Sequence, residues 1–303
     1  MFKENKAAGH KAIPLNTFKP YDFALSLRTV RSFQPSLSEQ SGLLHLATRI
    51  DGNQTLIEIS QSPESTGKLV ASSVPEVSKS QIRRIAEWVT FAELELAPFY
   101  SLIAEDPKLA PITHKLYGLK PMRPISLFEM AIVAIIEQQI SLAAAYKIRS
   151  RFVQQFGESL GDQWIFPEPY ALASSKIEDL RFCGLSRQKA QYIHELAVKI
   201  GDGTLNLDIL KTMSDEKARE TIIDLKGFGR WSADYILIRG LARPDCIPID
   251  DLAIRSVVGE YLGDGQRLSS LEVTDKLDRF RPYRGLLAFY LLADHRLKLA
   301  NTG

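Results

Sequence analysis

The stretch that decides the fold runs from Leu225 to Arg255 and reads LKGFGRWSADYILIRGLARPDCIPIDDLAIR. Just upstream, Ser214 and the acidic pair that follows it have the pattern of a helix N-cap, and we expect that helix to reach the start of the stretch. Gly227 is then expected to end the helix and Gly229 to allow a second reversal. This leaves Phe228 as the one bulky residue at the tip of the turn.

A second helix is expected to begin near Arg230, directly after this turn. A hairpin of this kind aims several backbone N–H groups and a positive helix N-terminus in one direction, and Arg230 adds a cation there. The pattern therefore predicts a binding site for a nucleic-acid phosphate that needs no contact with a base.

The second helix carries Trp231 and Tyr235 four residues apart, so both rings lie on one face. An aromatic pair on a helix is more often part of a core, and that interpretation stays open. The sequence that follows favours a functional role for the two rings, because Asp250 and Asp251 are expected to open a third helix that continues through Arg255. One aspartate is expected to cap this helix, which leaves the other for chemistry.

The hairpin, the Gly-Arg-Trp after it, and Pro-x-Asp-Asp-Leu with a basic residue four beyond the second aspartate resemble the helix-hairpin-helix DNA glycosylase superfamily. Within it, the spacing is similar to 3-methyladenine DNA glycosylase II, the AlkA type. The resemblance implies an α+β fold, with an N-terminal antiparallel sheet domain over residues 1–110 and a helical glycosylase region with the active-site cleft over residues 111–303.

The resemblance also implies a reaction: flipping of a damaged nucleotide and hydrolysis of the bond between an alkylated purine and its sugar. It makes Asp251 the catalytic residue and Asp250 a capping or supporting one. It assigns substrate binding to Trp231, Tyr235, Asp250 and Leu252, and DNA binding to Gly227, Phe228, Gly229, Arg230, Gln139, Ser186 and Lys189. Bifunctional relatives carry a lysine where this chain has Trp231, so we expect base removal without strand cleavage.

Gln138 and Gln139 interrupt the apolar run of a helix that Ser126 and Glu129 are expected to open as a capping box. Two buried amides that pin the end of the helix are an equally good explanation. The resemblance instead implies that the side chain of Gln139 enters the gap left by the extruded nucleotide.

The segment Gly184 to Ala190 is expected to begin another helix, with Ser186 as its N-cap. It resembles the family's Gly-x-Ser-x-x-Lys-Ala segment, which implies that Ser186 and Lys189 contact DNA. A solvated helix face explains Arg187 and Lys189 equally well.

The late helix after Pro282-Tyr283-Arg284 also resembles the family, but one feature departs from it. Some members supply a tryptophan from this helix to the base pocket, whereas Leu291 and Leu292 stand here, with Tyr290 nearby. The residue after the catalytic aspartate, aromatic in some relatives, is Leu252. The shape and selectivity of the pocket are therefore expected to differ from those of the family.

Composition bounds the function without identifying it. The chain has 303 residues, 45% hydrophobic and 24% charged, with a net charge of only +2, so any DNA-binding surface must be local. Cys183 and Cys246 are the only cysteines, which excludes a four-cysteine iron–sulfur cluster and argues against a disulfide scaffold. The five histidines lack metal-ligand spacing.

No apolar run has the length of a membrane span and no signal peptide is evident, so a cytoplasmic protein is expected. We expect double-stranded DNA with damaged bases as the partner, no membrane contact and a monomer. No cofactor is expected, with a monovalent cation at the hairpin as the one exception left open.

The N-terminal part has a β-like pattern, and the rest is mainly helical. Strands are expected over 23–30, 43–50, 55–60 and 68–72, with a tight turn at 51–53. The expected helices include 81–96, one opened by a capping box from Ser175 to Glu178, and 186–200.

Three other functions remain open from the residues. The same fold can act on deaminated or oxidised bases, although a neutral leaving group demands stronger activation. A non-catalytic helix-hairpin-helix protein would only hold DNA, but it has no need of Asp250 and Asp251. An unrelated metabolic enzyme has no phosphate loop or catalytic triad in its favour.

Overall fold

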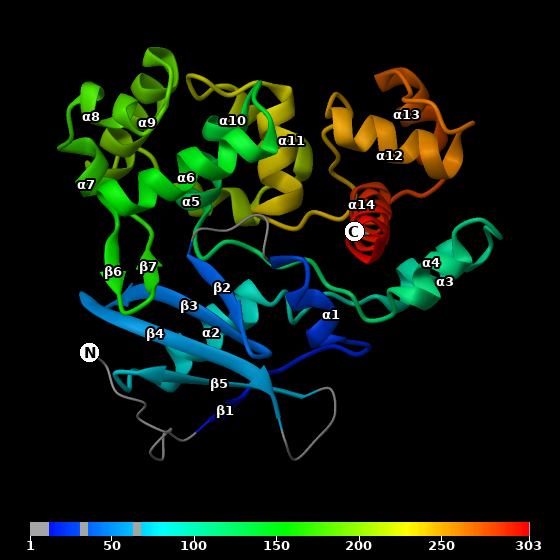
Figure 1. The fold of residues 1–303 in the computed structure, drawn as a ribbon, viewed down its shortest axis with the longest axis horizontal. Helices are drawn as coiled ribbons and strands as arrows, with labels where there is room; N and C mark the ends of the chain where they lie inside the picture. The colour runs from blue at the N-terminus through cyan, green and yellow to red at the C-terminus, as the bar shows by residue number, and fades with distance from the viewer. Residues whose placement is uncertain (1–11, 31–35, 63–67, 303) are drawn as a thin grey trace. The chain divides into compact units, whose positions relative to one another are not determined.

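The computed structural model describes residues 12–30, 36–62 and 68–302. Within these ranges an antiparallel sheet is followed by a large set of helices, which confirms the α+β fold class (Figure 1). The chain forms two compact units, each built from three segments: Met1–Thr17, Val30–Glu93 and Met122–Ile209 in the first, and Phe18–Thr29, Leu94–Pro121 and Leu210–Gly303 in the second. The boundary expected at residue 110 falls inside one segment of the second unit.

The sheet of the first unit has the strand order β1-β5-β4-β3-β2, with every pair antiparallel. Its strands are β1 Ile13–Pro14, β2 Leu37–Gln40, β3 Leu43–Ile50, β4 Asn53–Gln61 and β5 Leu69–Val74. The predicted hairpin is confirmed, because β3 pairs with β4 from Leu44↔Ile59 to Ile50↔Asn53. Asp51 and Gly52 have φ of 50° and 79°, as a type I′ turn requires.

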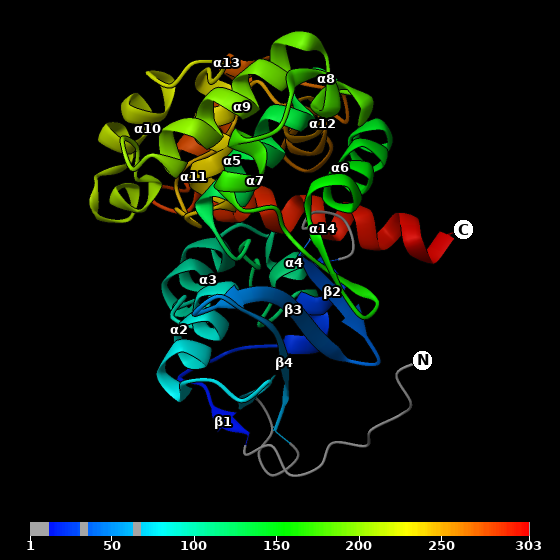
Figure 2. The same ribbon diagram turned by 90° about the vertical axis from the view of Figure 1, so that its left-hand side faces the viewer.

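Helix α2, Lys79–Val89, packs on this sheet through Ile82 and Ala86 (Figure 2). It is shorter than the helix expected over 81–96. Phe91 takes a left-handed φ of 48°, which an α-helix cannot contain, so the apolar residues beyond it belong to a turn.

The strand expected over 23–30 is wrong, since its first half forms the short helix α1, Phe23–Leu27. Asp22 caps this helix, with its Oδ1 accepting the N–H of Leu25 at 2.9 Å. Phe23 and Leu27 are four residues apart and both buried, a spacing that suits a helix as well as a strand in so short a segment.

The helical part of the first unit also contains a hairpin that the sequence did not indicate. Its helices are α5 Leu127–Glu137, α6 Leu142–Phe156, α7 Pro169–Ala173, α8 Ile177–Phe182 and α9 Arg187–Gly201, and its hairpin strands are β6 Glu158–Leu160 and β7 Gln163–Ile165. The hairpin reaches the sheet, where Glu158 pairs with Arg49 and accepts a 2.7 Å hydrogen bond from Gln54 (Figure 1). Strands of three residues are too short for a periodic signal.

The two predicted capping boxes differ from expectation. Ser126 does cap α5 and accepts the Glu129 N–H at 3.1 Å, but the Glu129 carboxylate bonds the hydroxyl of Ser36 at 2.8 and 2.7 Å. Burial raises the pKa of Glu129 to about 7. Ser175 does not cap α8, which begins after Lys176, because its hydroxyl donates to the Ala171 carbonyl at 2.6 Å.

The described residues of the second unit form helices joined by turns and loops, with no strand among them. Besides α1 it contains α3 Ala97–Ala104, α4 Ala110–Lys115, α10 Asp215–Ile223, α11 Arg230–Arg239, α12 Leu252–Leu262, α13 Ser270–Asp278 and α14 Arg284–Thr302, and a 3-10 helix, Leu207–Thr212, leads into it. Tyr290 of α14 is completely buried, donates to the Leu119 carbonyl at 2.7 Å and bonds Tyr100 at 2.8 Å. Tyr290 is therefore a core residue. Among the described helices, none combines the length and apolar character that crossing a bilayer requires.

Candidate active site

The predicted hairpin is formed by α10, α11 and the turn between them. Ser214 caps α10 as expected, and the helix ends at Ile223, slightly earlier than predicted. Gly227 has a φ of +91°, a conformation that favours glycine. Gly229 does not provide a second reversal, because its φ of −117° and ψ of −173° are open to any residue. Gly229 is instead the N-cap of α11, where it supplies no side-chain acceptor.

Phe228 lies between the two glycines of the turn, as expected, but its side chain is buried. Its side chain is 7% exposed, and its N–H donates to the Leu225 carbonyl at 3.1 Å. Burial removes the apolar ring of Phe228 from water, which stabilises the folded hairpin. The N–H groups of Arg230 and Trp231, at the start of α11, have no acceptor within the helix and are the ones suited to an anion.

An ion pair that the sequence pattern did not reveal holds the two hairpin helices together. Arg219 of α10 donates to Asp234 of α11 at 2.6 Å, and Asp234 is 2% exposed. Arg230 lies farther from the same carboxylate, with Nε at 3.7 Å from Oδ2, and its side chain remains 65% exposed. The hairpin is thus rigid at its base, while one arginine stays on its surface.

Trp231 and Tyr235 form a stacked pair, with ring centroids 4.9 Å apart and an angle of 18° between their planes. Both side chains are only partly buried, so the interpretation as core residues is wrong for this pair. Since the rings stack on each other, they leave no room for a third ring between them.

Asp251 is the cap of α12, a role that we expected of Asp250. Its Oδ1 accepts the N–H groups of Ala253 and Ile254 at 2.9 and 3.2 Å. Its Oδ2 accepts the indole N–H of Trp231 at 3.0 Å. Capping and chemistry do not need separate aspartates, because the two oxygens of one carboxylate divide these contacts.

Asp250 is exposed and accepts a 2.6 Å hydrogen bond from the hydroxyl of Ser270, the first residue of α13. This link fits the supporting role and not the capping role. Leu252 is 58% exposed beside the carboxylate. Arg255 turns away, since its Nε donates to the Leu268 carbonyl at 2.6 Å.

The geometry of Asp251 suits a fixed negative charge. Three N–H donors orient the carboxylate, two from the start of a helix and one from an aromatic ring. Such donors hold the carboxylate in one place, so a positive charge that develops nearby meets a preorganised counter-charge. The stacked rings next to it add an electron-rich surface.

The first unit presents Gln139 in the turn between α5 and α6. Gln138 is the C-cap of α5, and Gln139 follows it with a left-handed φ of 55° and an exposed side chain. Ile140 and Leu142 are 37% and 42% exposed in the same turn. The interpretation of two buried amides is therefore wrong for Gln139.

The turn between α8 and α9 confirms one predicted cap and changes one predicted role. The hydroxyl of Ser186 accepts the N–H of Lys189 at 3.2 Å. The Lys189 ammonium donates to the carbonyls of Ile136 and Gln138 at 2.9 and 2.6 Å, and burial lowers its pKa. Lys189 is thus bound to the end of α5, which a solvated face does not account for, and its contact with DNA stays a prediction. Ser186 and Arg187 are exposed, so contact of Ser186 with DNA stays a prediction.

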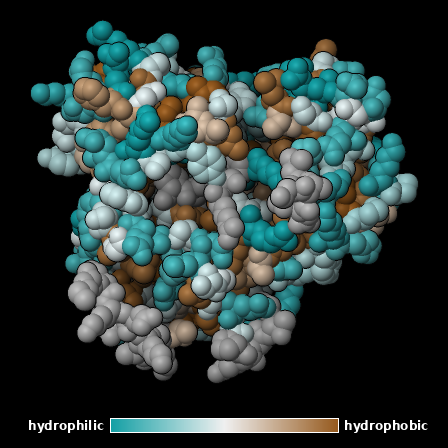
Figure 3. Space-filling model, viewed as in Figure 1, coloured by the Kyte–Doolittle hydropathy of each residue, from teal (hydrophilic) through white to brown (hydrophobic). Residues whose placement is uncertain are grey.

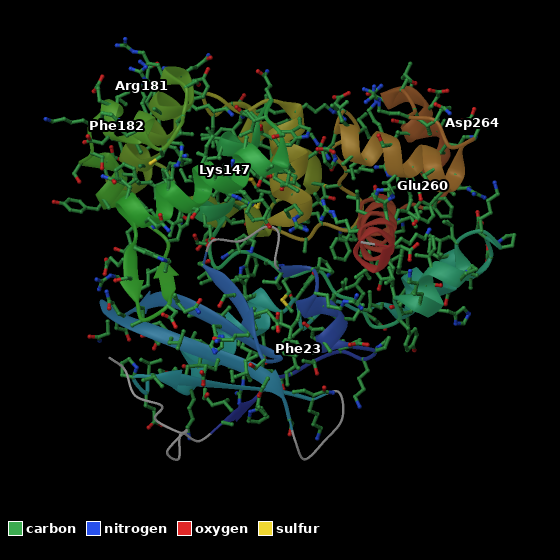
Figure 4. The ribbon with its side chains drawn as sticks, viewed as in Figure 1. Phe23, Lys147, Arg181, Phe182, Glu260 and Asp264 are labelled. Atoms are coloured by element: carbon green, nitrogen blue, oxygen red, sulfur yellow. The ribbon has the colours of Figure 1, made fainter. Side chains whose placement is uncertain are left out.

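The surface around this turn is polar. On the face drawn in Figure 3, hydrophilic side chains cover most of α8 and α9. Phe182 is an exception, 83% exposed at the end of α8 next to Arg181 (Figure 4). In the part of the chain that the structure describes, His, Cys, Asp and Glu side chains form no group of three that would hold a metal ion.

The sequence of this chain is similar to those of known DNA repair proteins. Residues 132–282 match the HhH-GPD superfamily of base excision DNA repair proteins. An alkylbase DNA glycosidase-like protein of Schizosaccharomyces pombe is 31% identical over 61% of this chain and 83% of its own length. A DNA-3-methyladenine glycosylase of Bacillus subtilis is 29% identical over 69% of this chain and 70% of its own.

A solved structure extends the likeness beyond the matched segment. The 3-methyladenine DNA glycosylase of Archaeoglobus fulgidus superposes with a TM-score of 0.81 at 27% identity, covering 95% of this chain and 98% of that one. These findings and the hairpin-to-aspartate geometry lead to one conclusion: the chain belongs to the HhH-GPD superfamily of base excision DNA repair proteins, as an enzyme of the AlkA type.

Proposed function

We propose that the protein is a monofunctional DNA glycosylase that releases alkylated purines of the 3-methyladenine type from double-stranded DNA. The observation that carries this proposal is the position of Asp251, whose Oδ2 lies 3.0 Å from the indole nitrogen of Trp231 beside the stacked Trp231–Tyr235 pair. A fixed anion and an electron-rich surface together fit a cationic base and a sugar that becomes cationic during the reaction.

DNA binding begins at the hairpin. The free N–H groups at the start of α11 and the exposed guanidinium of Arg230 take one backbone phosphate, with Gly227 and Gly229 allowing close approach. A monovalent cation at this turn remains a prediction. The damaged nucleotide then rotates out of the stack, at a cost of a few kcal/mol, and Gln139 fills the space that it leaves.

The flipped base packs against an outer face of the aromatic pair. An alkylated purine carries a positive charge, and contact with a ring is worth about 0.5–2 kcal/mol. Leu252 adds an exposed apolar side chain next to the carboxylate. Selection of alkylated over normal bases follows from this charge, because an uncharged purine gains only the stacking.

Asp251 acts as the bond between the sugar and the base lengthens. The bonding electrons move to the purine and neutralise it, so no general acid is required. Positive charge grows on the sugar, and the Asp251 carboxylate stabilises it. Water then adds to C1′ and loses a proton to the carboxylate or to solvent, which leaves an abasic sugar.

Strand cleavage is not part of this proposal. It requires an amine that forms a Schiff base with the sugar, and Trp231 occupies the position at which bifunctional relatives carry lysine. A monomeric state and action in the cytoplasm also remain predictions.

The experiment that tests the function follows base release and strand nicking on one panel of duplexes with methylated, deaminated or oxidised purines. We expect free methylated purine, intact strands until alkali is added, and much slower release of the neutral bases. If a deaminated or oxidised base were released faster than the methylated purines, that base and not an alkylated purine would be the substrate. Tight binding without release of any base would leave only a DNA-binding protein.

A further inference from the structure

The turn that presents Gln139 is held by contacts that the proposed reaction does not use. Gln139 adopts a left-handed backbone, which is unfavourable for a non-glycine residue. The last carbonyls of a helix also have no partner within it, and the Ile136 and Gln138 carbonyls belong to this end of α5. The left-handed residue and the helix-end carbonyls both make this turn unfavourable by itself. Contacts from other parts of the protein are therefore needed to keep it in one conformation.

Lys189 supplies such a contact from another helix. Its ammonium reaches the Ile136 carbonyl at 2.9 Å and the Gln138 carbonyl at 2.6 Å, so it bonds on both sides of the helix end. A cation at the C-terminus of a helix also interacts favourably with the helix dipole. The backbone of Lys189 is fixed in turn, because Ser186 caps the first turn of α9 through the Lys189 N–H.

A second contact braces the turn from the side of α6. Glu137, the last residue of α5, pairs with Arg149 at 2.8 Å, and their side chains are 9% and 4% exposed. The guanidinium of Arg149 also lies 4.6 Å from the ring centre of Tyr146. The backbone before Gln139 is therefore fixed by buried charges while the Gln139 side chain remains exposed.

We propose that Lys189 is a positioning residue for Gln139, and not a ligand of a DNA phosphate. By bonding the two carbonyls, it keeps the α5–α6 turn in the left-handed conformation that presents the Gln139 side chain for insertion into duplex DNA. This inference rests on the proposed function for its consequence in catalysis, but the contact itself can be tested without any reaction.

The first test is hydrogen exchange of the turn in the absence of DNA. Lys189→Met removes the donor and keeps the length of the side chain, and Lys189→Arg keeps a cation with several donors. We expect faster exchange of the amides over residues 138–141 in the methionine variant and near-parent exchange in the arginine variant. Lys199→Met, an exposed lysine near the other end of α9, is the matched control. Unchanged exchange at the turn in Lys189→Met would overturn the proposal, whatever the activity.

The second test uses the reaction. We expect Lys189→Met to slow release of methylated purine from intact duplex by about tenfold to a hundredfold, the range for a misplaced group. Release from single-stranded DNA, which has no stack to refill, should stay within about twofold. In a Gln139→Ala background, Lys189→Met should add little, because the side chain that it positions is absent.

The two roles of Lys189 also differ in salt dependence. If Lys189 bound a phosphate, its loss would lower the slope of log affinity against log salt by about one. We expect an unchanged slope for undamaged duplex. A lowered slope with equal losses on duplex and single strands would overturn the proposal, and Lys189→Gln replaces the methionine variant if that one does not fold. Absence of base release by the parent would count against the proposed function alone.

Discussion

Two turns in this protein have nearly the same construction and different surroundings. Between α8 and α9, Gly184 has a φ of +103° and precedes Leu185, which is 5% exposed. Between α10 and α11, Gly227 has a φ of +91° and precedes Phe228, which is 7% exposed. In both, a left-handed glycine lets the next residue bury its side chain, and a new helix begins after one further residue.

That further residue makes the difference. Ser186 caps α9 with its own hydroxyl, and the ammonium of Lys189 is bound to carbonyls of α5. Gly229 gives α11 no side-chain cap, and a Cβ built at this position meets no atom within 4 Å. The first helix start is thus closed by the protein itself, whereas the second is open to a ligand. The N-cap residue thus distinguishes two turns that are otherwise similar.

The largest expected effect lies beyond the second turn, at Asp251. Asparagine caps helices as well as aspartate, so Asp251→Asn keeps α12 and removes only the negative charge. We expect release of methylated purine to fall by about a hundredfold to a thousandfold, with an unchanged melting temperature. Asp250→Asn is the matched control and should retain most of the rate. A reversed order in single-turnover assays would mean that the wrong carboxylate was chosen.

A side-chain N-cap can be introduced at Gly229, where α11 has none. Gly229→Asp has room for its side chain and an ordinary backbone conformation, and its carboxylate competes for the amides and repels a phosphate. We expect about tenfold weaker binding of duplex DNA at constant salt. Ser186→Asp adds the same charge to the turn that is already capped, and a clearly smaller loss is expected. Equal losses in fluorescence anisotropy titrations would remove the distinction between the two turns.

Trp231, in the first turn of α11, connects the α10–α11 turn to the carboxylate of Asp251. Trp231→Phe keeps a ring against Tyr235 but removes the indole N–H that holds Oδ2 of Asp251. We expect about a fivefold lower rate of base release with little change in DNA affinity, because one orienting hydrogen bond is lost while the two helix N–H donors still hold the carboxylate. An unchanged rate constant under single-turnover conditions would show that this bond does not orient the carboxylate.

The smallest effect on activity is expected at Gly227, the left-handed glycine of the second turn, where a substitution mainly lowers stability. Gly227→Ala places a Cβ on a left-handed backbone and should cost about 1–2 kcal/mol in the free energy of unfolding. Gly229→Ala should cost less, about 0.5 kcal/mol, because its extended backbone accepts any residue and only the poorer N-cap propensity of alanine is added. Urea denaturation measures both, and equal destabilisation would contradict the assignment of the turn to Gly227 alone.

The sequence predicted those parts of the molecule that depend on neighbouring residues. The β3–β4 hairpin follows from Asp51-Gly52 between alternating residues, and the caps at Ser126, Ser186 and Ser214 follow from local hydrogen bonding. The turn at Gly227 and the start of α11 are of the same kind.

The parts that were missed depend on tertiary contacts. Whether Phe228 is buried and what the Lys189 ammonium binds depend on residues far away in the chain. A charged side chain on a helix has the same local pattern whether it meets water, a phosphate or a carbonyl. Only the structure separates these cases.

The most direct test of the central claim compares two abasic duplexes, one with a neutral tetrahydrofuran and one with a cationic pyrrolidine in place of the sugar. The pyrrolidine imitates the positive charge that the sugar acquires in the transition state, and an enzyme binds such an analogue more tightly than its ground-state counterpart. We expect the parent protein to prefer the cationic duplex by at least about a hundredfold, and Asp251→Asn to lose that preference while still binding the neutral duplex. Equal preference in the two proteins would contradict the role of Asp251.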